Sequence, residues 1–350
     1  MSGSEKKIGR RSMDIYQEIT DAYASELRHA LGSRFSLFAK WTPDDYVYPF
    51  SDVDLRIAMP EAEDLNEISD ILCRVHRKMV ASVPFGDRIL EHPYGFLYLD
   101  RDIAENRVIA DDIKRCYFVN GEVSAFRKLA VAAEAYAMSD PYFLRIIDGR
   151  LGRFTMINEY RFRDPVYQKQ YETYCLLWHY YLPCAYAVEC LKAGRVYPQK
   201  ICLDWYRSEY LSQIILEYRE GRIGVYDNDL VLKETERDLR RMLTKLPDRH
   251  ASRRQEEDRA LVTEAVCMLR TRCCRIAYYL APPLGIDTKY LMRRELSEFE
   301  RIACYLDTCG EAAKELRQIL RSDGSEAQKL RYIKRSMEER AEEYKQLCRV

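Results

Sequence analysis

The sequence predicts an α+β protein in which a small mixed-sheet domain is followed by a large all-helical region. Two observations indicate this layout. Between Phe35 and Val119, short runs of alternating apolar and polar residues are separated by turns and by one helix. After Gly121 almost no period-two pattern remains, and apolar residues recur at helical spacing instead. We therefore expect three successive segments, residues 1–120, 121–225 and 226–350.

Composition narrows the class of protein. The chain has 350 residues, 47% of them hydrophobic, and 56 basic residues balance 56 acidic ones. A general nucleic-acid-binding protein is usually basic, so nucleic acid is an unlikely partner. No apolar run reaches the length of a membrane span, and the first residues are polar and charged. We therefore expect no membrane association and a cytoplasmic location, with the oligomeric state left open.

Metal-binding cysteine motifs are missing from the sequence. None of the 12 cysteines is spaced Cys-x-x-Cys, and the five histidines are scattered. A zinc site is not expected, and buried free thiols in a reducing compartment are the simpler interpretation.

The elements of the first 120 residues follow in order. Apolar spacing predicts a helix from about Ser12 to Leu31, and alternation predicts strands over 34–41 and 52–59. An apolar face from Leu65 to Met79 predicts a second helix. Extended pieces are then expected over 88–90, 94–99, 107–113 and 115–119. Beyond Gly121 we expect helices over 122–138, 166–193, 199–220, 229–246, 254–281, 287–308, 310–322 and 325–348.

The chemistry centres on Ser51-Asp52-Val53-Asp54-Leu55. In a strand, Asp52 and Asp54 point to one face, because side chains repeat every two residues, and Val53 points to the core. Mg²⁺ prefers oxygen ligands and usually takes one or two carboxylates plus substrate phosphates. An acidic turn before an ordinary strand is the alternative.

The order of elements carries a family resemblance. The strand at Leu37-Phe38-Ala39-Lys40 is followed, about a dozen residues later, by the Ser51–Leu55 stretch. This order resembles the DNA polymerase β-like nucleotidyltransferase superfamily, nearest in layout to the aminoglycoside-type nucleotidyltransferases. The resemblance implies a nucleotidyltransferase-like domain over 1–120, an acceptor-binding helical domain over 121–225, and a C-terminal helical extension. It also implies two Mg²⁺ ions, ATP or another NTP as co-substrate, and transfer of a nucleoside monophosphate, AMP in the first instance, to a hydroxyl of a small molecule.

A third carboxylate is expected in Arg107–Ile113. Strand parity favours Asp112 over Asp111 as the third metal ligand, and a strand bulge would exchange the two. The resemblance implies that the third carboxylate is also the general base. Arg56 shares the parity of Asp52 and could contact phosphate, and an ordinary outer strand charge is the simpler interpretation. Ser51 could also contact phosphate. A second Asp-x-Asp pair, Asp100 and Asp102, is interpreted as a solvated loop.

The main departure from the family lies before the acidic strand. The usual Gly-Ser, which holds the phosphates, is replaced by Ala39-Lys40. Lys40 could contact a triphosphate by charge. The alternative is a catalytically inactive nucleotidyltransferase-fold protein that acts as a nucleotide-binding or interaction module.

Two further groups of residues have both a structural and a functional interpretation. Modification of a protein or RNA end would need a basic surface, but the arginines that could form one are expected to face solvent or pair with Glu256, Glu257 and Asp258. Those arginines are Arg253, Arg254, Arg270, Arg272 and Arg275. The aromatic run Trp178-His179-Tyr180-Tyr181 is interpreted as helix core, with an acceptor cleft as the alternative.

Overall fold

A computed structural model describes most of the chain. The described residues are 3–33, 35–40, 46–60, 64–104, 116–120, 143–144, 146–147, 150, 162–195, 197, 201–244, 254–282, 288–306 and 310–348. The chain forms two compact units. The first, here called the helical unit, comprises residues 1–17, 41–51 and 134–252. The second, the sheet unit, comprises residues 18–40, 52–133 and 253–350. Both units combine stretches that are distant in sequence, whereas we expected successive segments.

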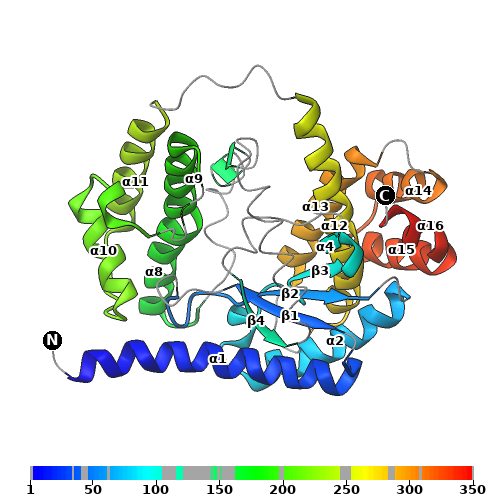
Figure 1. Ribbon diagram of the computed structural model, residues 1–350, viewed down its shortest axis with the longest axis horizontal. Coiled ribbons are helices and arrows are strands. Elements are labelled where there is room, and N and C mark those ends of the chain that lie inside the picture. Colours follow the sequence, from blue (N-terminus) through cyan, green and yellow to red (C-terminus); the bar gives the residue numbers. More distant parts are fainter. Residues whose placement is uncertain are drawn as a thin grey trace. The chain divides into compact units, whose positions relative to one another are not determined.

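The sheet unit contains a four-stranded mixed sheet in the order β3-β2-β1-β4 (Figure 1). Its strands are β1 (Ser36–Lys40), β2 (Asp54–Met59), β3 (Phe96–Leu99) and β4 (Cys116–Asn120). Strand β1 is antiparallel to β2 and β4, and β2 is parallel to β3. Every residue of β2 after Asp54 is buried, so β2 is a central strand covered on both faces. The α+β class that the sequence predicts is confirmed.

Helices complete the sheet unit. Helix α2 (Leu65–Ser82) begins at Asp64, whose carboxylate accepts a hydrogen bond from the Asn66 backbone N–H. The long helix α12 (Arg254–Leu280) packs against α2 and β3. The others are listed by their bounds: α3 (Gly86–Ile89), α4 (Asp100–Ala104), α13 (Thr288–Tyr305), α14 (Gly310–Arg321), α15 (Glu326–Glu339) and α16 (Ala341–Leu347).

The helical unit is built around one nearly continuous helix. It begins at α8 (Pro165–Tyr174), continues as a π-helix (Cys175–Tyr181) and ends with α9 (Leu182–Ala193). Gly194, at φ 64°, ends it in the left-handed conformation that glycine adopts without strain. The unit also contains a 3₁₀ turn (Leu203–Trp205), α10 (Glu209–Arg219) and α11 (Asn228–Leu243). Helix α1 (Gly3–Leu31) is divided between the two units.

Four predicted elements differ from the structure. Residues 88–90 are not a strand, because Gly86–Ile89 forms a helical turn, and three residues are too few to distinguish the two periods. The helix expected over 199–220 begins only at Glu209, because Ser208 caps it. The helix predicted over 325–348 is interrupted at Arg340, and the helix predicted from about Ser12 begins earlier, at Gly3. The predicted elements over 107–113 and 122–138 lie outside the described residues.

Within the described part of the chain, no helix is both long enough and apolar enough to cross a bilayer.

Candidate metal centre

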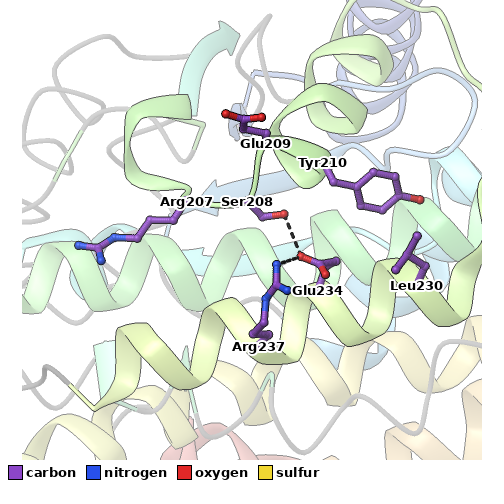
Figure 2. A pocket seen from close by; sticks show the side chains of 7 residues that line it. All are labelled: Arg207, Ser208, Glu209, Tyr210, Leu230, Glu234 and Arg237. Atoms are coloured by element: carbon purple, nitrogen blue, oxygen red, sulfur yellow. Dashed lines mark hydrogen bonds and ion pairs between the residues drawn. The ribbon is translucent and has the colours of Figure 1, made fainter.

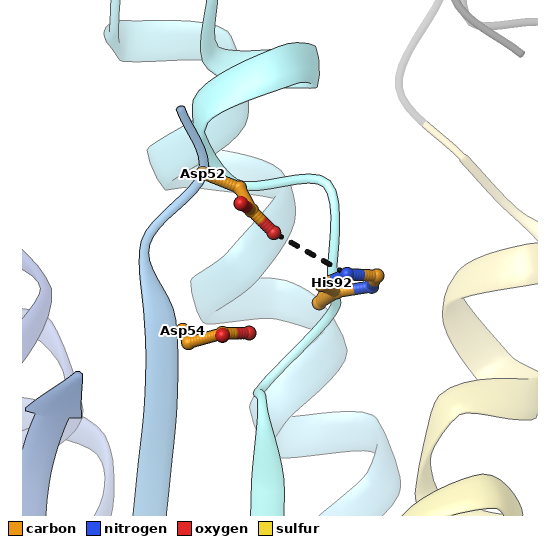
Figure 3. A group of neighbouring side chains, drawn as sticks. All are labelled: Asp52, Asp54 and His92. Carbon is orange, nitrogen blue, oxygen red and sulfur yellow. Dashed lines mark ion pairs between the residues drawn. The ribbon is translucent and has the colours of Figure 1, made fainter. Parts of the chain in front are cut away.

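Two carboxylates lie at the start of β2. Asp54 is the first residue of the strand, and Asp52 precedes it in the segment that leads in from the loop. The intervening residue holds this geometry, because the Val53 backbone N–H donates to the Ile89 carbonyl at 2.7 Å while its side chain is buried. The side chains of Asp52 and Asp54 remain 16% and 29% exposed. The sequence expectation that both carboxylates share one side agrees with Figure 3.

His92 lies beside the two carboxylates and completes a cluster of three side chains. Its Nε2 lies 3.3 Å from Oδ2 of Asp52, and one ligand atom from each of the three residues lies within 4.8 Å of the others (Figure 3). His92 belongs to the segment between α3 and β3. Because β2 and β3 are parallel and Arg56 lies opposite Phe96, the segments before both strands run side by side. The sequence did not predict His92 as part of this site, because only the pairing of β3 with β2 brings it to Asp52 and no local sequence pattern encodes that pairing.

Arginines from distant helices hold the His92 segment. From α12, Arg275 Nε donates to the Pro93 carbonyl at 2.8 Å, and its NH2 group donates to the Gly95 carbonyl. From α13, Arg294 NH1 donates to Glu91 at 3.0 Å, and its NH2 lies 3.2 Å from Nδ1 of His92. The position of the imidazole is therefore set by the tertiary fold and not by its own loop.

Burial and neighbouring charges shift the pKa values of Asp52 and His92 in this cluster. Burial, and next the charge of Asp54, raise the pKa of Asp52 above the usual carboxyl value, whereas Arg88 and Arg294 act in the opposite direction. Burial and then the charge of Arg294 hold the pKa of His92 well below its usual value, so the imidazole is neutral at pH 7. Two carboxylates that repel each other beside a neutral ring can be relieved by a divalent cation. Their oxygen atoms are the ligands that Mg²⁺ and Mn²⁺ prefer.

Two of the residues predicted to bind nucleotide, Arg56 and Lys40, belong to the strands β2 and β1 of the sheet. Arg56 is 1% exposed. Its NH1 donates to the Leu55 carbonyl at 2.8 Å and lies 3.9 Å from Asp54, and its guanidinium covers the Phe96 ring. Lys40 lies opposite Asp54 in the β1–β2 pairing, and its side chain is outside the described structure.

Ser51 is placed in the helical unit, where its hydroxyl is engaged. Ser51 Oγ accepts from the Val47 backbone N–H at 2.9 Å and lies 3.0 Å from the Tyr174 hydroxyl. The residue is 4% exposed, and its carbonyl accepts from the Tyr16 hydroxyl at 2.8 Å. These bonds fix the loop before Asp52. The predicted third carboxylate, Asp112, and its alternative, Asp111, lie outside the described residues.

The interpretation of Asp102 as part of a solvated loop is wrong. Asp102 is fully buried in α4 and forms an ion pair with Arg270 of α12. Its Oδ2 also accepts from the Leu99 backbone N–H at 2.7 Å, which satisfies an amide at the start of α4. Asp100, by contrast, is exposed.

The expectation that the α12 arginines face solvent is also wrong for the three whose side chains are described. Arg270, Arg272 and Arg275 are 1%, 6% and 3% exposed. Arg272 NH1 forms an ion pair with Glu295 at 2.8 Å, and Arg275 binds backbone carbonyls. These side chains are buried because partners from other elements satisfy them, so they form no basic surface for a protein or RNA end.

The aromatic run in the π-helix is largely core. The Trp178 ring stacks on Tyr174, with centroids 5.4 Å apart, and on Tyr218, with centroids 5.7 Å apart. The hydroxyl of Tyr181 donates to the buried Asp238. Stacking on two neighbours and burial support the core interpretation over an acceptor cleft.

The helical unit also has an open pocket of about 460 Å³ between α10 and α11. Figure 2 shows Glu234 at its centre, accepting from Ser208 at 3.3 Å and paired with Arg237. Arg207 and Glu209 add one charge of each sign to its lining. Charge alone therefore selects no ligand class for this pocket.

No protein-family model, no curated protein and no solved structure matches this chain. The class of site is consequently defined by its own geometry, which is a partly exposed pair of carboxylates with an adjoining histidine at the entrance to a central strand.

Proposed function

We propose that this chain is a Mg²⁺-dependent nucleotidyltransferase that moves a nucleoside monophosphate, AMP from ATP in the first instance, onto a hydroxyl of a small molecule. The observation that carries the proposal is the clustering of Asp52 and Asp54, with ligand atoms within 4.8 Å, at the entrance to a central strand. The order of a first strand, the acidic segment and a second strand resembles the polymerase β-like superfamily.

The donor set fits a divalent cation. Asp52 and Asp54 offer carboxylate oxygens from one side of the strand, and both side chains are partly exposed. Bound there, Mg²⁺ would neutralise charge on a triphosphate and withdraw electron density through its phosphoryl oxygens, which makes the attacked phosphorus more electrophilic. The protein's own contribution is to hold the two carboxylates in place through the Val53 and Ile89 backbone bond, and to keep the centre partly desolvated. Asp112 remains the predicted third ligand and general base.

One observation favours a second function. Ser51, which the sequence predicts to bind nucleotide, already accepts a hydrogen bond from the Val47 backbone N–H at its Oγ and contacts the Tyr174 hydroxyl. With Ala39-Lys40 in place of Gly-Ser, this supports the alternative of an inactive nucleotide-binding or interaction module.

Binding and turnover separate these functions. The full chain is titrated calorimetrically with a non-hydrolysable ATP analogue and Mg²⁺, and is then incubated with α-labelled ATP and a panel of hydroxyl-bearing acceptors. We expect Mg²⁺-dependent binding and transfer of label, both lost in Asp52→Asn and both retained in the control Asp70→Asn, which alters an exposed carboxylate of α2. Binding without transfer to any acceptor would support the inactive module, and no binding would reject both functions.

A further inference from the structure

The contacts of His92 define where its proton lies. Arg294 NH2 lies 3.2 Å from Nδ1 of the imidazole. A guanidinium can only donate, and it keeps its charge at any pH at which the protein is folded. Nδ1 must therefore present its lone pair to Arg294, which leaves the ring proton on Nε2.

The contact on the opposite side of the ring independently places the proton on Nε2. Nε2 lies 3.3 Å from Oδ2 of Asp52, and a carboxylate can only accept unless it is protonated. With the proton on Nε2, both contacts are hydrogen bonds. With the proton on Nδ1, an N–H would face Arg294 and a lone pair would face Asp52, so both contacts would be repulsive.

Arg294 is itself held in place. Its NH1 donates to Glu91 at 3.0 Å, and Glu91 also forms an ion pair with the fully buried Arg88. The Arg294 side chain is only 18% exposed. The donor that faces Nδ1 is therefore part of a fixed network that joins α13 to the segment before β3.

We propose that Arg294 is a positioning residue of the candidate metal centre, which fixes His92 as the Nε2–H tautomer so that the imidazole donates to Asp52 and does not bind the cation. The cation-binding part of this inference rests on the proposed function. His92 orients one carboxylate, and the described part of the centre then supplies only oxygen ligands. Such a set suits Mg²⁺ and Mn²⁺ better than Zn²⁺, for which imidazole is a favoured ligand.

The tautomer is measured directly in the cation-free full chain. Nitrogen-15 NMR of the histidine side chains, assigned with His92→Gln, distinguishes Nε2–H from Nδ1–H imidazole. We expect Nε2–H in the wild type and in Arg294→Lys, because a lysine ammonium is also a donor only. A wild-type spectrum showing the Nδ1–H form would overturn the inference.

Coordination is tested with Mn²⁺ and Zn²⁺ alone. Electron spin-echo spectroscopy of bound Mn²⁺ should show no directly bound nitrogen in the wild type. In Arg294→Met no donor faces Nδ1, and a cation on Asp52 competes with His92 for the carboxylate. Nδ1 can then carry the proton and Nε2 becomes available, so we expect a nitrogen coupling and a Zn²⁺ affinity about tenfold higher relative to Mg²⁺. The control Arg293→Met removes a neighbouring arginine that is 74% exposed and should leave both readouts unchanged.

The outcomes separate this inference from the proposed function. A nitrogen coupling from His92 in the wild type would overturn the role of Arg294 while leaving a metal-dependent enzyme in place. An Nε2–H tautomer in a chain that binds neither Mg²⁺ nor Mn²⁺ would support the role of Arg294 in fixing the ring and overturn the proposed function.

Discussion

Replacing Asp52 with asparagine is expected to stabilise the cation-free protein. The charged form of Asp52 is disfavoured in the fold, because burial and then the charge of Asp54 raise its pKa. Asparagine removes the charge, keeps the size of the side chain, and retains an oxygen that can accept from His92. A functional carboxylate held at the expense of stability should behave in this way.

The magnitude follows from the spacing of the cluster. The ligand atoms of Asp52 and Asp54 lie within 4.8 Å of each other. At that distance two unit charges repel by about 1 kcal/mol in bulk water and by about 3.5 kcal/mol at an effective dielectric constant of about 20. Arg88 and Arg294 attract the same carboxylate and offset part of this repulsion. We therefore expect Asp52→Asn to raise the free energy of unfolding by about 1 kcal/mol.

Urea unfolding in the presence of a chelator measures this difference. Asp70→Asn is the matched control, since that carboxylate is exposed on α2, and it should change stability by less than about 0.5 kcal/mol. Added Mg²⁺ should stabilise the wild type and the control but not Asp52→Asn. A loss of more than about 1 kcal/mol in chelated Asp52→Asn would refute the reasoning, because it would make the carboxylate a structural group.

Three further predictions concern pH, the buried ion pair and the His92 segment. The pKa of Asp52 is raised in the folded state, so the cation-free wild type should lose stability relative to Asp52→Asn as pH rises from the ordinary carboxyl pKa through the raised pKa. A stability difference between the two proteins that does not change with pH would contradict this. Arg270→Met leaves Asp102 buried without its partner and should cost about 3–5 kcal/mol in urea unfolding, so a cost below about 1 kcal/mol would contradict the pairing. At Gly95, φ is 63° and a Cβ would overlap the Leu55 carbonyl, so Gly95→Ala should cost at least about 2 kcal/mol of unfolding free energy. Gly32 has the same backbone conformation but open space around it, so Gly32→Ala should cost less. Equal costs for the two variants would refute the close approach at Gly95.

The sequence predicted those features that depend on local periodicity. Alternation located β1, β2 and β3 to within about two residues, and helical spacing located α11, α12 and α13. The placement of Asp52 and Asp54 on one side follows from the two-residue repeat of an extended chain, so it too could be predicted.

The remaining features depend on contacts between distant segments. His92 reaches Asp52 only because β3 pairs in parallel with β2, and no local pattern encodes that pairing. Arg270 and Asp102 are separated by 168 residues, and each resembles a solvent-exposed charge until the other is brought into contact with it. Charged residues that pair within the core therefore produced the largest errors of the sequence analysis.

The measurement that tests the central proposal most directly is anomalous diffraction from crystals of the full chain soaked with Mn²⁺ and a non-hydrolysable ATP analogue. We predict an anomalous peak in contact with carboxylate oxygens of both Asp52 and Asp54, with the analogue's phosphates beside it and Nε2 of His92 bonded to Asp52. Bound analogue with no Mn²⁺ at these two carboxylates would contradict the proposed metal centre.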